Sequence, residues 1–431
     1  MAAIEHGASV IIVDDLSKIA YVTDTNVVLV LVDDTRQIIS NIAAAWFDYP
    51  AKKLLTIGIT GTKGKTTTAY MTKAILEHAG MKTGIIGTVE LFDGKNSMNN
   101  INTTPSAIEI QKWLSAMVDN GCEAVVMEVS SQGMKHFRCE AMIFDICAFT
   151  NLKPDHIGKG EHRDFFEYRA CKSRLFRKCV TGIFNMDDEQ TKYVLKGHTC
   201  RVLGYSAVYA ADYMATDIEK IKFNGAGMSF KFNDVPLQIN IPGIFNVYNA
   251  LCAASIATEC GIGTDIIKEA LSVVTIRGRS EYVPVSEDFI VLLDYAHNAM
   301  SLRVLLKTIR EYEPGRIVCL FGCGGNRSKL RRYEMGEVSG RLADYTIITS
   351  DNPRDEEPLS IIDDIVSGIE KTSGEYTVIP DRKEAILFAI ENARKGDIII
   401  IAGKGHEAYQ EIKGKRYHMD DRELILQAKN G

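Results

Sequence analysis

The sequence predicts an α/β fold with two separate parallel sheets, and three observations lead to this prediction. From residue 53 onward, apolar strands alternate with amphipathic helices, as in a parallel sheet that helices cover on both faces. A break at residues 200–242 divides this series from a second series of the same kind. The length of 431 residues also exceeds what one ordinary hydrophobic core spans, so more than one domain is expected.

The first series predicts a P-loop-type central domain at 51–276. Its strands lie in the segments LLTIGIT, TGIIGT, EAVVMEVS and FDICAFTN, and helical segments follow the first strand and Pro105. Residues 200–242 instead show short alternating strands with Asn-Gly and Asn-Asp turns, which predict a small antiparallel insert. Two helices are expected after this insert, at 245–260 and 264–273.

The second series predicts a Rossmann-like C-terminal domain at 277–431. Its strands lie in FIVLLDYAH, RIVCLFGCGG, DYTIITSDNP, EYTVIPD and DIIIIAGKGHE. Each strand ends in small, polar or charged residues, and the ligands of open α/β sheets gather at the carboxyl ends of the strands. Binding residues are therefore expected in the loops that follow these strands.

Composition and charge exclude several classes of protein. Hydrophobic residues make up 46% and charged residues 25%, as in a soluble globular protein, and the net charge of −6 without a basic cluster argues against nucleic-acid binding. No apolar run approaches the ~18 residues that a membrane helix needs, and the N-terminus lacks the basic start of a signal peptide. The ten cysteines form no C-x-x-C pair, which favours a reducing cytoplasm over a disulfide framework.

A phosphate-binding loop follows the first strand of the central domain. The segment GTKGKTTT turns glycine N–H groups toward phosphate oxygens, while Lys65 can reach the terminal phosphates and Thr66 can bind Mg²⁺. Because Ile59 stands where the longer loop pattern requires glycine, this is the short G-x-x-G-K-T form. A glycine-rich turn that only caps a helix is the plain alternative, and the flanking strand and helix argue against it. Glu128 ends a buried strand beside the loop, where a carboxylate can hold Mg²⁺.

Further motifs follow the phosphate loop in a fixed order. They are NTTP at 102–105, MEVSS at 127–131, FTNLKPDHIG at 149–158, CKSRLF at 171–176, GIFNVYNAL at 243–251, GRSE at 278–281, DYAH at 294–297, FGCGGNR at 321–327, SDNPR at 350–354 and AGKGHE at 402–407. With these motifs the sequence resembles the Mur ligase family from residue 50 to its end. It looks most like the branch that adds the third residue of the peptidoglycan stem peptide.

The resemblance implies a mechanism, two cofactors and a modified lysine. Members of this family bind ATP and two Mg²⁺ ions, activate a carboxylate as an acyl phosphate, and join it to an amine. The family's counterpart of Lys172 is carbamylated, which turns an ammonium into a carboxylate-like metal ligand. The implied catalytic residues are Lys65, Glu128, His156 and Lys172, and the implied metal ligands are Thr66, Glu128, His156 and Lys172.

The motifs also imply two sets of binding residues. ATP is expected to contact Gly61, Thr62, Lys63, Gly64, Lys65, Thr66, Thr67, Asn246, Asn249, Arg279, Asp294 and His297. The muramoyl-peptide substrate is expected to contact Thr103, Thr104, Ser130 and Arg138, and the incoming amino acid Arg327, Asp351, Asn352, Arg354, Gly403 and Glu407. From the residues alone, Asn246 and Asn249 fit a capping role equally well, and Lys172 would be a solvated helix lysine.

Arg354 indicates which amino acid is added. Its planar fork suits a carboxylate, and meso-diaminopimelate carries a second α-carboxylate where lysine has only an ammonium. The implied reaction therefore adds a diamino acid, most consistent with meso-diaminopimelate, to UDP-N-acetylmuramoyl-L-alanyl-D-glutamate in peptidoglycan precursor synthesis. The plain alternative for Arg354 is a surface arginine that pairs with Asp355 or Glu356.

Three other functions stay open at this point: a lysine-adding homologue, a ligase like folylpolyglutamate synthetase, and a catalytically silent nucleotide-binding paralogue. The resemblance implies that residues 1–50 are a truncated remnant of an N-terminal UDP-binding domain, which favours the silent paralogue. The intact set of implied catalytic residues argues against it. We expect a cytoplasmic monomer whose partners are small-molecule substrates, without nucleic acid and without membrane insertion.

Overall fold

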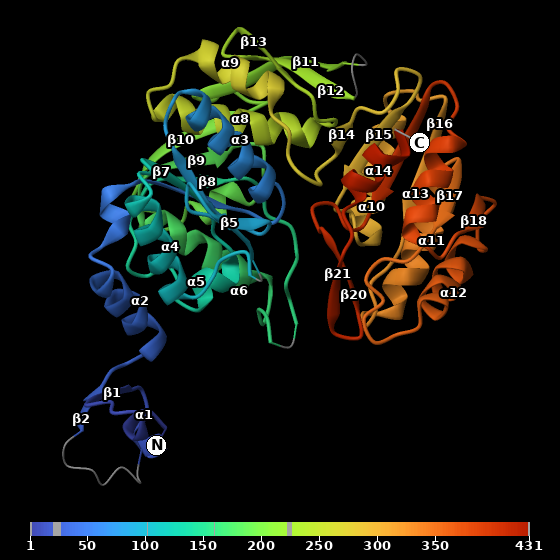
Figure 1. Ribbon diagram of the computed structural model, residues 1–431. Coiled ribbons are helices and arrows are strands. Elements are labelled where there is room, and N and C mark those ends of the chain that lie inside the picture. Colours follow the sequence, from blue (N-terminus) through green and yellow to red (C-terminus); the bar gives the residue numbers. More distant parts are fainter. Residues whose placement is uncertain (1, 20–26, 101, 159, 222–225, 430–431) are drawn as a thin grey trace. The chain divides into compact units, whose positions relative to one another are not determined.

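The computed structural model describes residues 2–19, 27–100, 102–158, 160–221 and 226–429 (Figure 1). These residues group into two compact units. The first unit holds the residues up to Met214 together with Tyr248–Ile267, and the second holds Ala215–Val247 together with the residues from Lys268 onward. The domain limits given above follow the motifs rather than the contacts, and they remain predictions.

A mainly parallel sheet forms the centre of the first unit, which confirms the α/β fold that the alternating pattern predicts. Its parallel strands lie in the order β10, β9, β8, β3, β7, β4, and β5 and β6 extend the sheet antiparallel. The strands span Leu55–Thr60 (β3), Thr83–Ile86 (β4), Glu90–Phe92 (β5), Ser97–Asn99 (β6), Ala124–Glu128 (β7), Phe144–Phe149 (β8), Cys179–Asn185 (β9) and Arg201–Ser206 (β10).

Helices follow the strands of this sheet. They span Lys65–His78 (α3), Ala107–Asp119 (α4), Ser131–Lys135 (α5), Phe165–Ser173 (α6) with a 3-10 turn at Arg174–Arg177, Thr191–Val194 (α7), Ile244–Glu259 (α8) and Thr264–Val273 (α9). Every residue of β7 is buried, and α3 packs against β3, β4 and β7. Burial along the whole of a strand is expected where helices cover both faces of a parallel sheet.

The N-terminal residues form two short strands and a longer helix. β1 (Val10–Val13) and β2 (Val28–Leu31) pair in parallel, and α2 (Thr35–Trp46) follows them. Helix α1 spans Ala2–Glu5, and 3-10 turns span Leu16–Ile19 and Pro50–Lys53. The buried face of α2 packs against α4.

The antiparallel insert is smaller than the sequence suggested. β11 (Tyr213–Ile221), β12 (Gly227–Phe232) and β13 (Val235–Ile239) pair antiparallel, but β10 belongs to the parallel sheet, beside β9. The predicted Asn-Asp turn joins β12 to β13, and Asn233 and Asp234 have φ values of 43° and 71°, as a two-residue hairpin turn requires. The predicted Asn-Gly turn at 224–225 lies outside the described residues.

A second sheet forms the centre of the second unit, in the order β14, β15, β19, β16, β17, β18. All its pairs are parallel except the edge pair of β14 and β15. The strands span Glu281–Val283 (β14), Ile290–Asp294 (β15), Arg316–Phe321 (β16), Tyr345–Ile348 (β17), Glu375–Val378 (β18) and Asp397–Ala402 (β19). The helices span Ala299–Arg310 (α10), Lys329–Leu342 (α11), Pro358–Ile369 (α12), Arg382–Glu391 (α13) and Asp421–Lys429 (α14).

After β19 the chain forms a short hairpin of β20 (Tyr409–Ile412) and β21 (Lys415–His418) before α14. A fully buried ion pair, with 2.6 Å between Arg382 Nη2 and Asp421 Oδ2, ties α14 to α13. Across the described parts of the chain, no helix has both the length and the apolar character that crossing a bilayer requires.

Candidate active site

The phosphate loop lies between β3 and α3, as the motif predicts. Gly61 and Gly64 have φ values of 153° and 85°, and a Cβ atom on Gly64 would lie only 2.3 Å from Asn249 Oδ1. Lys65 begins α3, and its Nζ donates to the carbonyls of Gly61 (3.0 Å) and Thr62 (3.1 Å). The loop therefore places backbone N–H groups, a helix N-terminus and an ammonium at one point, which suits the phosphates of a nucleotide.

Thr66 and Glu128 supply oxygen atoms beside this loop. Glu128 is fully buried, and its carboxylate accepts from the Thr66 hydroxyl (2.9 Å) and from the Thr88 backbone N–H (2.8 Å). Thr67 is buried next to Thr66 in the first turn of α3. A hydroxyl and a carboxylate held together are ligands that Mg²⁺ accepts, with phosphate oxygens completing its shell. The residues present thus fit a Mg²⁺ ion bound with ATP.

Lys172 reaches the phosphate loop from α6, far along the chain. Asp164 caps the start of this helix, and Lys172 Nζ donates to the Gly61 carbonyl at 2.8 Å. The side chain is buried, and its ammonium lies 4.9 Å from the ring centroid of Tyr168. Burial, reinforced by the charge of Lys65, lowers the pKa of Lys172 well below its usual value. The buried position of Lys172 differs from the solvated helix surface that the sequence alone suggested, and it favours the uncharged amine over the ammonium.

His156 is exposed in the loop between β8 and α6. Its backbone is left-handed, with φ 54°, and its Nδ1 lies 3.0 Å from Glu161 Oε1. The neighbouring Asp155 carboxylate lies 3.6 Å from Lys63 Nζ, which connects this loop to the phosphate loop. Lys63 also donates its backbone N–H to Asn151 Oδ1 (2.9 Å). These contacts place the His156 segment next to the phosphate loop, with His156 itself paired to an acid.

His162 is a residue that the sequence analysis missed. It is fully buried, its N–H donates to the His156 carbonyl (3.0 Å), and its Nε2 lies 2.9 Å from Ser131 Oγ. Its ring stands edge-on to Tyr168, whose hydroxyl lies 3.0 Å from that of Thr62. His162 therefore joins the His156 loop, α5 and the phosphate loop. The sequence could not predict the burial of His162, because a single histidine in a polar loop belongs to no recognisable motif.

The residues predicted to bind the muramoyl peptide come together at the carboxyl end of β7. Thr104 Oγ1 donates to the carbonyl of the last residue of β7 (2.8 Å) and accepts from the Ser130 backbone N–H (2.9 Å). Arg138 Nη1 donates to the Thr104 carbonyl at 2.6 Å. Thr103 is adjacent, with its hydroxyl 3.0 Å from that of Thr88. One cluster thus joins four predicted residues from segments that lie far apart in the sequence.

The two asparagines of the GIFNVYNAL motif have different surroundings. Asn249 is buried against the phosphate loop, at the position that a side chain on Gly64 would occupy, and its Oδ1 accepts from Thr68 Oγ1 at 3.4 Å. Asn246 is also buried, and its Nδ2 donates to the Pro242 carbonyl at 2.7 Å. The structure therefore places Asn249 at the nucleotide loop and gives Asn246 a capping bond in its own turn.

Three predicted ATP contacts lie at the start of the second unit. Asp294 ends β15 and accepts from the Ser280 backbone N–H (2.8 Å), and burial raises the pKa of its carboxyl. The Arg279 guanidinium lies 4.9 Å from the Tyr295 ring centroid. His297 is exposed, and its Nδ1 lies 2.9 Å from the Tyr295 carbonyl.

The loops after β16, β17 and β19 pack so closely that glycine is required in them. A Cβ atom on Gly325 would lie 1.9 Å from the Pro353 carbonyl oxygen. Gly403 has φ 107°, and a Cβ atom there would lie 2.8 Å from Asp351 Oδ2. Arg327 is exposed at the edge of this group. The predicted amino-acid-binding residues of these three motifs thus meet at the carboxyl edge of the second sheet.

Asn352 and Glu407 form the buried part of this site. Asn352 Nδ2 donates to Glu407 Oε2 at 2.8 Å, and burial together with Asp351 raises the pKa of Glu407. Lys404 is fully buried between them, with its Nζ 3.3 Å from Asn352 Oδ1 and 3.7 Å from Glu407 Oε2. Lys404 lies within the AGKGHE motif, but no role was predicted for it. In the structure, its buried side chain contacts both Asn352 and Glu407 and so orients these two predicted binding residues.

Arg354 presents its guanidinium beside this buried group. Its φ is 52°, and its Nη1 donates to a backbone carbonyl of the GCGG loop at 2.7 Å. Its ion-pair partner is Glu411 of β20, with 3.5 Å between Nε and Oε2. The alternative partners Asp355 and Glu356 instead accept from Asn326. Arg354 therefore contacts the loop after β16 and strand β20, and it does not pair with the acidic residues that precede the following helix.

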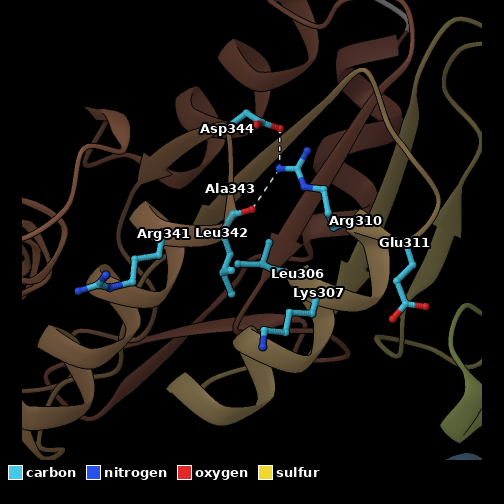
Figure 2. A pocket seen from close by; sticks show the side chains of 8 residues that line it. All are labelled: Leu306, Lys307, Arg310, Glu311, Arg341, Leu342, Ala343 and Asp344. Carbon is cyan, nitrogen blue, oxygen red and sulfur yellow. Dashed lines mark hydrogen bonds and ion pairs between the residues drawn. The ribbon is translucent and has the colours of Figure 1, made fainter.

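A separate cavity of about 470 Å³ lies away from these motifs, between the end of α10 and the start of β17 (Figure 2). Arg310 crosses it and donates to the Leu342 carbonyl (3.1 Å) and to Asp344 Oδ2 (2.8 Å). Because β17 begins here, the cavity is at the amino edge of the sheet, opposite the edge that carries the predicted ligands.

Comparison with known families identifies the class of protein. The Mur ligase middle domain matches residues 59–257, and the glutamate ligase domain of Mur ligases matches residues 278–405. The chain belongs to the Mur ligase family, as its motifs indicated, and is an ATP-dependent, Mg²⁺-dependent ligase.

Individual relatives narrow the comparison further. The chain is 42% identical over 427 residues to the UDP-N-acetylmuramoyl-L-alanyl-D-glutamate–2,6-diaminopimelate ligase of Caldanaerobacter subterraneus subsp. tengcongensis, covering 98% of this chain and 87% of that protein. It is 39% identical over 432 residues to the ligase of the same name from Clostridioides difficile, with 98% and 87% covered. A solved structure of a diaminopimelate ligase of this name is 28% identical, with a TM-score of 0.71, and covers 100% of this chain and 88% of its own.

Proposed function

We propose that this ligase adds meso-diaminopimelate to UDP-N-acetylmuramoyl-L-alanyl-D-glutamate, with ATP, in the synthesis of a peptidoglycan precursor. The observation that carries the proposal is the site at the second sheet, where Arg354, Asn352 and Glu407 meet with a buried lysine. A guanidinium beside a carboxylate and an amide suits an end group that bears both a carboxylate and an amine. The relatives with the highest identity reported above carry this activity in their names.

The residues of the first unit support the activation of a carboxylate. ATP binds on the phosphate loop, and the substrate carboxylate attacks its γ-phosphoryl group to give an acyl phosphate and ADP. The amine of the incoming amino acid then attacks the acyl carbon, its nitrogen loses a proton to water, and the bond from the acyl carbon to the phosphate oxygen breaks, which gives an amide and inorganic phosphate. Lys65 neutralises the charge that develops on the transferred group, and Thr66 and Glu128 would hold the Mg²⁺ ion that supplies further charge stabilisation.

We further propose that Lys172 is carbamylated and, with His156, holds a second Mg²⁺ ion. Carbamylation requires an uncharged amine, because the nitrogen lone pair attacks CO₂ and a proton is released. Burial lowers the pKa of Lys172 and so favours the uncharged form that this reaction needs. The added carboxylate would stand at the Gly61 carbonyl, beside the phosphate loop.

The proposed place of action is the cytoplasm, with the ligase acting as a monomer. All ten cysteines are free thiols, and nine of them are buried, which fits a reducing compartment.

Phosphate release tests the proposal directly. The purified protein is given ATP, Mg²⁺ and the UDP-linked dipeptide, with meso-diaminopimelate, lysine or no amine. We expect phosphate release with diaminopimelate, at least tenfold slower release with lysine, and background without an amine. Faster release with lysine would identify the lysine-adding homologue. Release with a folate and glutamate but not with the dipeptide would support the folylpolyglutamate alternative, and no amine-dependent release at all would support the silent paralogue.

A further inference from the structure

We propose that Glu411 determines specificity for the added amino acid, because its carboxylate competes with the substrate's far carboxylate for Arg354. Glu411 thereby weakens the binding of a diamino acid that carries a carboxylate at its far end. This inference rests on the proposed function, since it takes Arg354 as the residue that receives that carboxylate.

The backbone, rather than the ion pair, holds Glu411 beside Arg354. The Arg354 N–H donates to the Glu411 carbonyl (2.9 Å), and the Lys413 N–H donates to the Arg354 carbonyl (2.8 Å). The Glu411 N–H in turn donates to Asn352 Oδ1 at 2.9 Å. β20 is thus fastened along the SDNPR loop, and the two side chains stay adjacent whether or not their charges attract.

The ion pair itself contributes little to the position of Arg354. Its Nε–Oε2 distance of 3.5 Å is long for a hydrogen bond, and the side chains of Arg354 and Glu411 are 23% and 26% exposed. Pairs of this kind contribute little to stability. Arg354 has a shorter bond of 2.7 Å from Nη1 to the Gly325 carbonyl. Removing the Glu411 charge should therefore leave the guanidinium where it is.

The negative charge of Glu411 opposes the binding of a substrate carboxylate to Arg354. A carboxylate that binds a guanidinium bidentately needs two neighbouring N–H donors. Nη1 is already engaged by a carbonyl, and Glu411 lies on the Nε side. An incoming carboxylate therefore meets a like charge within a few ångströms, and the repulsion is only partly screened in a half-buried site.

Lysine differs from diaminopimelate at its far end, which carries the ammonium but not the carboxylate. Glu411 attracts the ammonium that both substrates carry, and it repels only the carboxylate of diaminopimelate. Glu411 thus disfavours diaminopimelate relative to lysine and narrows the difference in affinity between the two substrates. A residue that only supported the fold would change both affinities in the same direction.

Glu411→Gln tests this, because it removes the charge and keeps the size of the side chain. We expect the KM for diaminopimelate to fall roughly 3- to 10-fold relative to the KM for lysine, because the substitution removes a charge that repels only the carboxylate of diaminopimelate. The change should shrink in high salt, because salt screens partly exposed charges. Glu423→Gln is the matched control: it removes the same charge from an exposed pair with His418 and should leave the ratio of the two KM values unchanged.

The outcomes separate this inference from the proposed function. If the wild-type ligase releases no phosphate with diaminopimelate, the proposed function fails. If the wild type uses diaminopimelate but Glu411→Gln leaves the ratio of the KM for diaminopimelate to the KM for lysine unchanged or raises it, only the role of Glu411 is overturned. Glu411→Ile, a residue suited to a strand, must shift the ratio in the same direction, which excludes an effect peculiar to glutamine.

Discussion

The two sites of this ligase are built in different ways. At the phosphate loop, backbone groups and the buried side chains of Glu128, Thr66 and Lys172 make up the site. At the amino-acid site, the side chains come from three loops, and Arg354 remains partly exposed. The first site leaves its groups little freedom, whereas the second relies on a balance of neighbouring charges. Changes at the first site should therefore lower kcat, and changes at the second should alter KM and substrate preference.

Lys65→Ala should give the largest effect. Lys65 is the cation of the loop that can oppose the charge on the transferred phosphoryl group, so its loss should reduce kcat by several powers of ten, on the order of 4 kcal/mol or more. Single-turnover phosphate release measures this effect. Lys112→Ala, at an exposed position of α4, is the control and should stay close to wild type. Turnover of Lys65→Ala near the wild-type rate would contradict the assignment of this site.

Lys172→Ala should come next, with a loss of roughly 10²- to 10³-fold in kcat, which is about 3–4 kcal/mol. Short carboxylic acids should restore part of the activity, because they can take the place of the carbamate. A second readout does not depend on activity: protein equilibrated with ¹³C-labelled CO₂ should show a carbamate NMR signal that is lost in Lys172→Ala. If the wild-type protein shows no carbamate signal, Lys172 is not carbamylated.

The difference between the two sites also explains what the sequence could predict. The phosphate loop is local, so eight consecutive residues between a strand and a helix were enough to place Lys65 and Thr66. The position of Glu128 followed from the end of a buried strand, and the structure puts its carboxylate 2.9 Å from Thr66. The resemblance supplied Lys172, but its burial depends on residues more than a hundred positions away.

At the amino-acid site, the sequence indicated the motifs but not their partners. Lys404 sits inside a recognised motif, yet its contact with Asn352 depends on how two loops pack. Glu411 lies on a hairpin whose position against Arg354 no local pattern encodes. The extent of the antiparallel insert was misjudged for a similar reason, because the pairing of β10 in parallel with β9 and with the start of β11 depends on segments outside β10 itself.

Arg354→Ala tests the charge balance of the second site. It should raise the KM for diaminopimelate steeply and reduce the preference over lysine. A buried bidentate contact would be worth roughly 2–5 kcal/mol, and the partial exposure of Arg354 places the expected loss nearer 2–3 kcal/mol, or about 30- to 150-fold in KM. Steady-state kinetics with both amino acids measure it. If Arg354→Ala changes kcat and leaves both KM values unchanged, the proposal that the second site acts through substrate affinity is wrong.

His406 offers the smallest test, because burial and nearby cations both act on the charge of its ring. Burial, followed by the charges of Arg279, Arg277 and Lys404, lowers the pKa of His406 to about 4. In the unfolded chain the pKa is near its ordinary value of 6.5. Between these two values the unfolded chain binds the proton and the folded chain does not, so acid favours unfolding. The contribution is therefore fully present above pH 6.5, declines as the pH falls toward 4, and is constant below that.

His406→Gln should remove this decline. Between pH 7 and pH 4.5, the free energy of unfolding should fall by roughly 1–3 kcal/mol less in the variant than in the wild type. Urea unfolding at both pH values measures the difference. His418→Gln is the control of opposite sign, since the bond to Glu423 raises the pKa of His418 and its small stabilising effect is present at low pH and lost as the pH rises. If His406→Gln and wild type decline in parallel, neither burial nor the neighbouring cations lower the pKa of His406. The contrast between a rigid phosphate site and a charge-balanced amino-acid site would then rest on the kinetic variants alone.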